Sequence, residues 1–548
     1  MEKKSDLGFL GRHPLLIAFI FMALCLMPVM IMRDFSPDNE LRYLQIADEA
    51  IEDGSVFAFT LQGEPYADKP PLYLWIVILS RLLLGKHSMF LLSLFSLLPA
   101  FVIIAIMDRW SGLEKASERV GVAFMMMTCA LFLGMSVFLR MDMLMTMFIV
   151  LALHSFWQLY EGTGNRKRQE ILLPVWIFLA LFTKGPVGIL MPPVAIACFL
   201  LLKRKGREIG KYLGWKTWGI IAGLCLVWFA GVYLDGGKAY LDNLLFHQTM
   251  GRAVNSFHHK APFWYYFVAI WAIVAPYMFL LVGAVIVSLL RPSEGTSRSD
   301  REVFFCTTVV STFVMLSLFS GKLAIYLAPV MPFMVLLFVE VLRRVGWRRW
   351  MTWSLAIPAA VVAVLALGLL IVRCFGMGDA RVSELFVDYP FLRSGPVWFA
   401  VGLLLAGHTL ALCYLVRGRR DFAVIMMGTA LLLAAYSASS VTPQLNDWIG
   451  WGNLCKTISP DETVATVYMR RPYPMKVYLG RDIHDYDKDF AAFHAAEVEG
   501  RSPEDGSLVL VTRTKRLGRD AGLEAFAKAN PHWFVGPYCL VSFRPEEP

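Results

Sequence analysis

Long apolar runs constrain the fold of this chain more than any other feature of its sequence. Runs near 20 residues, the length that a helix needs to cross ~30 Å of hydrocarbon, recur from residue 14 to about residue 440 of the 548 residues. Only 17% of the residues are charged, against about 25% in a soluble domain. The first run, residues 14–32, is too long for the apolar part of a signal peptide, so we interpret it as a retained helix. The sequence therefore predicts a polytopic α-helical membrane protein.

Basic residues in the short loops between these runs predict the topology. We place thirteen spans at residues 14–32, 88–107, 120–139, 143–160, 171–183, 187–202, 215–234, 264–290, 303–320, 326–342, 352–373, 396–416 and 422–440. Six loops carry at least three Lys or Arg each: 108–119, 161–170, 203–216, 291–301, 343–349 and 417–420. Cytoplasmic loops are enriched in these residues, so we predict that these loops and the N-terminus are cytoplasmic. The net charge of +9 then reflects topology and not a surface for nucleic acid.

The apolar stretch "PLYLWIVILSRLLL", residues 71–84, does not fit this scheme as a span. It covers about 14 residues and is interrupted by Arg81, which is short for a crossing and typical of an interfacial helix. A crossing here would also invert every later loop and break the charge rule. We therefore predict interfacial helices in the first outer loop and a tail on the same, outer side of the membrane.

The tail differs from the rest of the chain in pattern. Strand-like runs ("ETVATVYM", "SLVLVTRT", "WFVGPYCLVSF") alternate with helical ones after about residue 443. This predicts a small α/β domain, residues 443–548, that follows a membrane domain, residues 1–442. The nine cysteines contain no CxxC pair, so we infer neither a structural zinc site nor a disulfide framework. Cys455 and Cys539 both lie in the tail, and the sequence leaves open whether they pair.

The first outer loop carries acids at the edge of the membrane, where ionisable residues are functional candidates by default. Ser36-Pro37-Asp38 is typical of a helix start, and Asp38 and Glu40 lie in its first turn, followed by Arg42. Acids in a first turn also stabilise the helix dipole, which is the structural alternative. The position beside the membrane favours a role in a reaction.

The motif "YADKPP" closes the same loop. Its Asp68 and Lys69 precede two prolines and follow Tyr66. One interpretation is a surface ion pair worth about 0–1 kcal/mol before a helix start. The other is that Lys69 binds an anionic lipid headgroup while Asp68 ligates a cation.

Further outer segments bring polar groups to the same membrane depth: Arg140 and Asp142, Lys184, His247 and Arg252, and Lys322 and Tyr326. Arg140 and Asp142 could form only a structural ion pair. Histidine is a common metal ligand and arginine binds phosphate, but the local histidine spacing does not make a zinc site by itself. Lys322 and Tyr326 would share one face of a helix if their segment is helical, and the alternative for Tyr326 is an interfacial aromatic belt.

Together these residues supply basic groups suited to a phosphate and carboxylates suited to a cation or a proton. The sequence has no Walker A, GxGxxG or Ser-His-Asp pattern. We therefore expect the negative charge of a donor to belong to a lipid and not to a soluble nucleotide.

The stretches "DNELRY", "YADKPPLYLW", "RMD", "TKGPVGILMP", "FHQTMGR" and "GKLAIYLAPVMP" follow one another within about residues 14–335. In this combination the chain resembles the GT-C superfamily of polyprenyl-phosphate-sugar-dependent glycosyltransferases, nearest to lipid A aminoarabinose transferases (ArnT-like) and bacterial protein O-mannosyltransferase-like enzymes. The resemblance implies a hexosyl or pentosyl transferase of the bacterial inner membrane. It further implies a cytoplasmic N-terminus, a periplasmic active site and C-terminal domain, and a monomer that contacts membrane lipids and no nucleic acid.

The resemblance also implies roles for single residues. A divalent cation, zinc or magnesium, would be held by Asp68 and His247. The phosphate of the donor would be gripped by Lys69, Arg252 and Tyr326, with Tyr66 and Lys322 nearby. The acceptor and reaction side would be lined by Asp38 or Glu40, Arg42 and Asp142. Two departures stand out: Asp68 replaces the usual Glu, and Asp38 lies one position earlier than the usual aspartate.

The implied reaction is a direct displacement at the anomeric carbon of an undecaprenyl phosphate-linked sugar, with inversion. The acceptor is a periplasmic group such as a lipid A phosphate; the alternative is a protein or glycan hydroxyl. A different class, a transporter or flippase for a lipid-linked anion, predicts internal repeats and charges buried within spans. We find no convincing repeat, and the charges gather at one face.

Overall fold

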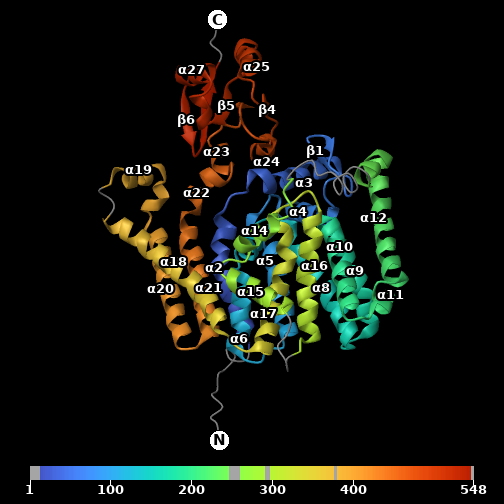
Figure 1. Cartoon of the computed structure of the whole chain (residues 1–548). Coiled ribbons are helices and arrows are strands. Elements are labelled where there is room, and N and C mark those ends of the chain that lie inside the picture. Colours follow the sequence, from blue (N-terminus) through green and yellow to red (C-terminus); the bar gives the residue numbers. More distant parts are fainter. Residues whose placement is uncertain (1–12, 246–259, 291–296, 376–378, 545–548) are drawn as a thin grey trace.

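The structure is a computed structural model that describes residues 13–245, 260–290, 297–375 and 379–544. Helices form an upright bundle, and a small domain that contains the C-terminal strands sits on one end of it (Figure 1). The predicted fold class, a polytopic helical membrane protein with a small C-terminal α/β domain, is thereby confirmed.

Nine helical segments of the described chain are long and apolar enough to cross a membrane. They are α2 (Pro14–Met32), α5 (Met89–Ser111), α8 (Met141–Glu161), α12 (Trp215–Asp242, continuing to Leu245), α16 (Asp300–Leu318), η4 with α17 (Ala324–Val345), α18 (Arg349–Phe375), α20 (Gly395–Val416) and α21 with its continuation (Arg420–Ile449). Each coincides with a span predicted from the sequence.

The remaining predicted spans correspond to shorter, broken or less apolar helices of the bundle. They are α6 with α7 (Ala116–Thr128 and Ala130–Val137), α9 (Arg166–Lys184), α10 (Pro186–Leu202) and α14 with α15 (Tyr265–Ile273 and Met278–Leu289). The pair α6–α7 is bent by 74°. The number thirteen itself stays a prediction.

The two broken helix pairs, α6–α7 and α14–α15, form hydrogen bonds with each other at their breaks. The backbone N–H of Ala130, freed where α6 ends, donates to the carbonyl of Ala275 at 2.9 Å. Close by, the hydroxyls of Thr128 and Tyr277 lie 2.9 Å apart. Free backbone groups are costly in hydrocarbon unless protein partners satisfy them, so each break stabilises the other.

The loop between α2 and α5, residues 33–88 and here called the first loop, is folded onto the end of the bundle. It contains the π-turn η1 (Pro37–Leu41), α3 (Arg42–Asp53), the short strands β1 (Thr60–Leu61) and β2 (Glu64–Pro65), and α4 (Pro71–Leu84). The helix α4 is the segment that the charge rule excluded as a span. It begins at two prolines and ends at Gly85, whose φ of 68° lies in the left-handed region. Its 14 residues fit an interfacial helix.

The C-terminal domain is built on a five-stranded mixed sheet of order β4-β3-β5-β7-β6. The strands are β3 (Thr463–Thr466), β4 (His484–Asp485), β5 (Leu508–Arg513), β6 (His532–Val535) and β7 (Tyr538–Phe543). β3 is parallel to both β4 and β5, whereas β7 is antiparallel to β5 and β6. Helix α27 (Ala521–Ala529) covers one face through Leu523 and Phe526.

All nine cysteine thiols are free. The pairing of Cys455 and Cys539 that the sequence left open is therefore absent from this structure. Cys539 lies inside the sheet, where burial raises its thiol pKa to about 11, and burial raises the pKa of Cys455 to about 12.

The C-terminal domain shares a hydrophobic core with the first loop. Tyr43 and Tyr73 of the first loop are buried in one cluster with Trp451 and Leu540. Asp34, directly after α2, accepts hydrogen bonds in the same region from the backbone N–H of Gly452 at 2.6 Å and from the hydroxyl of Tyr478. The domain is thus held against the loop that carries the predicted acids.

Candidate functional site

Asp142 carries one of the two fully buried carboxylates among the predicted site residues. It lies in the first turn of α8 and is 1% exposed. Lys184, the last residue of α9, donates a hydrogen bond to Asp142 Oδ1, and Arg140 Nε lies 3.3 Å from Asp142 Oδ2. Two basic side chains therefore contact one buried carboxylate at the end of the bundle.

Lys184 links this carboxylate to a distant aromatic residue. Its Nζ lies 4.8 Å from the centroid of the Tyr326 ring, within the range of a cation–π contact. The position of Lys184 follows from its neighbour Gly185, which ends α9 at a φ of 113°. Asp142 and Tyr326, predicted from separate segments, are therefore neighbours of the same lysine.

The "YADKPP" motif forms a second polar cluster. Asp68 Oδ2 accepts a hydrogen bond from the hydroxyl of Tyr66 at 3.1 Å and lies 3.1 Å from Lys69 Nζ. The side chains of Asp68 and Lys69 are 14% and 20% exposed. The backbone carbonyl of Tyr66 accepts from the hydroxyl of Tyr240 in α12 at 2.7 Å, which fixes the motif on the bundle. The charge of Lys69 acts on Lys184, so the two clusters share one electrostatic environment.

Asp38 and Glu40, the two candidate acids at the start of the first loop, have opposite environments. The side chain of Asp38 is 54% exposed, and its Oδ2 lies 3.7 Å from Arg470 of the C-terminal domain. Glu40 is 1% exposed and forms a bidentate pair with Arg33, with both distances 2.7 Å. Arg42, predicted to line the same acceptor side, lies near the ring of Tyr43, with its guanidinium carbon 5.9 Å from the ring centroid.

The prediction that Lys322 and Tyr326 share one helical face is wrong. The chain is extended at Leu323 (φ −132°, ψ 140°), and only from Ala324 does a short 3₁₀ helix begin. Lys322 is 5% exposed and donates to the backbone carbonyls of Ala261, at 3.1 Å, and Phe319. These bonds tie the start of η4 to the segment before α14, which is a structural role for the ammonium.

The predicted divalent-cation site is not supported by the described residues. They contain no group of three or more His, Cys, Asp and Glu side chains that could hold a metal ion. Among the described contacts, Asp68 pairs with Lys69 and accepts a hydrogen bond from Tyr66. His247 and Arg252 lie outside the described residues, so their predicted roles stay predictions.

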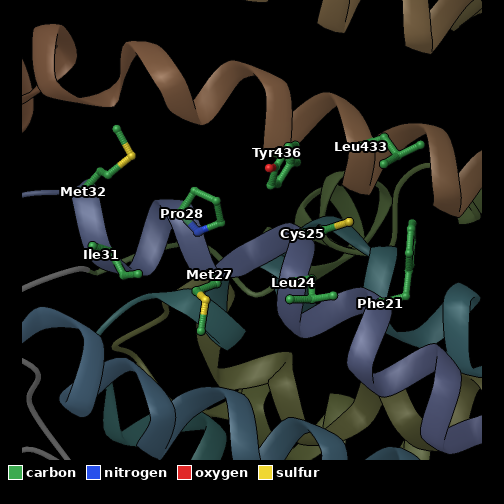
Figure 2. Close-up of a pocket in the computed structure, with 9 residues that line it drawn as sticks. All are labelled: Phe21, Leu24, Cys25, Met27, Pro28, Ile31, Met32, Leu433 and Tyr436. Carbon is green, nitrogen blue, oxygen red and sulfur yellow. The ribbon is translucent and has the colours of Figure 1, made fainter.

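Two cavities lie elsewhere. An apolar pocket of about 580 Å³ lies between α2 and α21 and is lined by residues such as Pro28, Met32, Leu433 and Tyr436 (Figure 2). A more polar cavity of about 390 Å³ lies between the first loop and the C-terminal domain, with Glu52 and Lys476 in its lining. Neither is lined by Asp142, Lys69 or Tyr326.

The sequence did not indicate the roles of Arg33 and Tyr73. Arg33 appears in sequence only as a basic residue after the first span, and Tyr73 as one aromatic residue in an apolar helix. In the structure the Tyr73 hydroxyl is buried, has no hydrogen-bond partner among the described residues, and feels the charges of Glu40 and Asp142. A usable signal for Arg33 was its position, since a cation at a membrane edge needs a partner.

Comparisons with known proteins show what the chain is similar to. The family model described as dolichyl-phosphate-mannose-protein mannosyltransferase matches residues 68–233, the stretch that contains Lys69, Asp142 and Lys184. A crystal structure of ArnT from Cupriavidus metallidurans bound to undecaprenyl phosphate superposes with a TM-score of 0.70 at 17% identity and covers 98% of both chains. The chain has the fold of the ArnT-like GT-C glycosyltransferases. The resemblance predicted from the sequence is thereby confirmed.

Two relatives found by sequence share one name, that of an arabinosyl transferase. An undecaprenyl phosphate-alpha-4-amino-4-deoxy-L-arabinose arabinosyl transferase of Erwinia tasmaniensis is 24% identical over 327 residues, which is 58% of this chain. One of Pectobacterium carotovorum is 25% identical over 457 residues and covers 78% of each chain. The match to the Erwinia protein spans 57% of that protein's length.

Proposed function

We propose that this chain is an integral membrane glycosyltransferase that moves a sugar from an undecaprenyl phosphate-linked donor to an acceptor such as a lipid A phosphate. The observation that carries the proposal is the buried Asp142, held by Arg140 and Lys184 beside Lys69 and Tyr326. These groups lie at one end of a bundle that has the ArnT-like fold. Membrane lipids and the lipid-linked donor are then the partners of this end.

The donor would lie with its phosphate near Lys69. An ammonium aimed at a leaving phosphate stabilises the negative charge that develops as the anomeric C–O bond breaks, and such fixed electrostatics often supplies most of an enzyme's rate enhancement. We place Tyr66, which donates to Asp68, and Tyr326, which lies by Lys184, near the same phosphate, with Arg252 as our proposed second cation. One displacement by the acceptor then inverts the anomeric configuration.

The acceptor decides whether a base is needed. A phosphate acceptor is already ionised, so Asp142 would only orient it, together with Arg42. A hydroxyl acceptor must lose a proton, and Asp142 would take it while the hydrogen bond from Lys184 keeps the carboxylate in place. Asp38 is the only one of the two first-loop acids with an accessible carboxylate, and we place it on the acceptor side.

No step of this mechanism passes through a metal ion. The described residues do not assemble a site for one, and Asp68 instead orients Lys69 and Tyr66. We propose that the protein lies in the bacterial inner membrane as a monomer, with a cytoplasmic N-terminus and a periplasmic C-terminal domain. The excess of Lys and Arg in alternate loops supports this orientation.

The test compares strains that lack the gene and carry either the wild-type protein or Lys69→Ala. Lipid A, other periplasmic glycans and glycoproteins are analysed by mass spectrometry. Lys488→Ala, at an exposed lysine of the C-terminal domain, is the matched control. We expect the wild type and the control to restore a sugar modification and Lys69→Ala to lose it at equal membrane levels.

Two results would reject the proposal. One is that the three strains and the deletion strain that carries no copy of the gene have identical lipid A, glycans and glycoproteins. The other is that the purified protein moves a lipid-linked anion between leaflets of a vesicle without any transfer of sugar, which would favour a transporter. Modification of a protein or glycan and not of lipid A would leave the reaction intact and change only the acceptor.

A further inference from the structure

Glu40 is the most completely hydrogen-bonded carboxylate near the candidate site. Its Oε1 accepts from Arg33 Nη2 at 2.7 Å and from the backbone N–H of Leu139 at 2.8 Å. Its Oε2 accepts from Arg33 Nη1 and from the backbone N–H of Ser36, both at 2.7 Å. A carboxylate offers about four acceptor positions, and all four are used. Glu40 therefore has no position left for the proton of an acceptor.

The bond to Leu139 reaches across 99 residues of sequence. Leu139 is fully buried in the extended connector between α7 and α8, and the connector continues through Arg140 into the first turn of α8. Its N–H belongs to no helix, so without Glu40 it would be an unsatisfied donor in a dry environment, which destabilises this geometry of the connector. Asp142 follows Leu139 by only three positions.

Other contacts fasten the same connector from its remaining sides. Ser93 and Ser96 of α5 donate to the carbonyls of Val137 and Phe138 at 3.2 and 2.7 Å. The guanidinium of Arg33 lies 4.5 Å from the ring centroid of Phe138. The Arg33–Glu40 pair thus grips both the ring before Leu139 and the N–H of Leu139.

Glu40 and Asp142 also share one buried environment. The hydroxyl of Tyr73, which has no hydrogen-bond partner among the described residues, feels the charge of both carboxylates. A site of this kind excludes water, so a small displacement of Asp142 changes its interaction with Lys184 strongly. Pre-organised geometry is what such a site contributes to a reaction: a misplacement of about 1 Å can cost about 100-fold in rate.

We infer that Glu40, with Arg33 as its counter-ion, is a positioning residue that sets the place of Asp142 through the backbone of Leu139. This inference rests on the proposed function and assigns Glu40 a role other than that of the reaction base. The structural alternative is that the buried Arg33–Glu40 ion pair contributes only to the stability of the fold. The two differ in what happens when the pair is shortened or replaced without unfolding the protein.

Glu40→Asp tests the link directly. The shorter carboxylate keeps the charge opposite Arg33 but cannot reach both Arg33 and the N–H of Leu139. We expect kcat for sugar transfer to fall about 100-fold, the KM for the lipid-linked donor to change less than about threefold, and the pH dependence of kcat to keep its acidic limb. In the same variant, hydrogen exchange of the peptide that contains Leu139 should accelerate.

Arg33→Met/Glu40→Leu separates position from stability, because replacing a buried ion pair by apolar residues of similar volume is often neutral. It should still fold, with a melting temperature lowered only by the unpaired N–H groups of Leu139 and Ser36, and show the same loss in kcat. Glu49→Asp is the matched control: Glu49 lies in the same loop and accepts from the backbone N–H of Gln62 at 2.9 Å, yet has no contact with the connector. It should transfer sugar at the wild-type rate.

The outcomes are separable. Wild-type kcat in Glu40→Asp, or unchanged exchange at Leu139, overturns the inference. Loss of the acidic limb of the pH profile together with activity would make Glu40 the base and also overturn it. If the wild-type protein transfers no sugar, the proposed function fails, while exchange at Leu139 still decides whether Glu40 holds the connector.

Discussion

Asp34 is expected to hold the C-terminal domain on the membrane bundle, and Asp34→Ala should release it. Asp34 Oδ2 accepts from the backbone N–H of Gly452 at 2.6 Å, and Oδ1 accepts from the hydroxyl of Tyr478. Both bonds cross from the first loop to the C-terminal domain, and both have a charged acceptor. Burial and the charge of Asp34 raise the pKa of Tyr478 well above its usual value, as expected for a hydroxyl that stays protonated against a carboxylate.

The magnitude follows from these two bonds. A hydrogen bond to a charged group contributes about 1.5–3 kcal/mol, so two give about 3–6 kcal/mol. Water entering the vacated space rehydrates part of the lost donors, and we expect about 3 kcal/mol less free energy of docking. Since about 1.4 kcal/mol changes an equilibrium constant tenfold, the population of protein with an undocked C-terminal domain rises on the order of 100-fold.

Hydrogen exchange in the purified protein measures this population. Peptides that cover α22 (Thr442–Ile449) and α23 (Gly452–Lys456) should exchange about 100-fold faster in Asp34→Ala wherever exchange requires undocking. Gly450→Ala should act alike, because its added Cβ would collide with the Asp34 carboxylate. Asp447→Ala, which loses one hydrogen bond within the domain, is the control. Equal exchange in Asp34→Ala and the wild type would refute the argument.

Three further outcomes are expected. Cys455 and Cys539 should resist maleimide at pH 7.5 in the folded protein, because burial raises their thiol pKa to about 12 and about 11. Both thiols should react with maleimide after denaturation without reductant. A requirement for reductant would indicate a disulfide. Burial alone would raise the pKa of Glu497, but hydrogen bonds, first that from His484, lower this pKa. The stability that Glu497 contributes to the domain is therefore present above the unfolded-state pKa of about 4.3 and is lost as pH falls through the folded-state pKa. Thermal unfolding of the C-terminal domain between pH 7 and pH 3 should show this loss, and Glu497→Gln should remove its contribution. Asp142→Asn should lower kcat about 10²–10⁴-fold with a hydroxyl acceptor and much less with a phosphate acceptor; equal losses with both would reject Asp142 as a base.

Sequence patterns predicted those features that depend only on residues close together in the sequence. Whether a run of residues can cross hydrocarbon depends on its length and composition, and the predicted spans coincide with helices of the bundle. The exclusion of residues 71–84 as a span also needed no tertiary information, since it followed from its short length and the charge rule. The same reasoning failed at Lys322 and Tyr326, because a spacing of four residues aligns two side chains only if the segment is α-helical, and this one is extended and then 3₁₀.

The roles of the acids were decided only in three dimensions. Asp38 and Glu40 are two residues apart in one turn, and no local rule distinguishes an exposed carboxylate from a buried one. Glu40 is buried because Arg33, Ser36 and the distant Leu139 converge on it. The sequence by itself determined a membrane bundle, an interfacial first loop, a tail domain and the residue types at one membrane face. Tertiary packing decided which carboxylate pairs with which cation, because these ion pairs join helix ends that are far apart in the sequence.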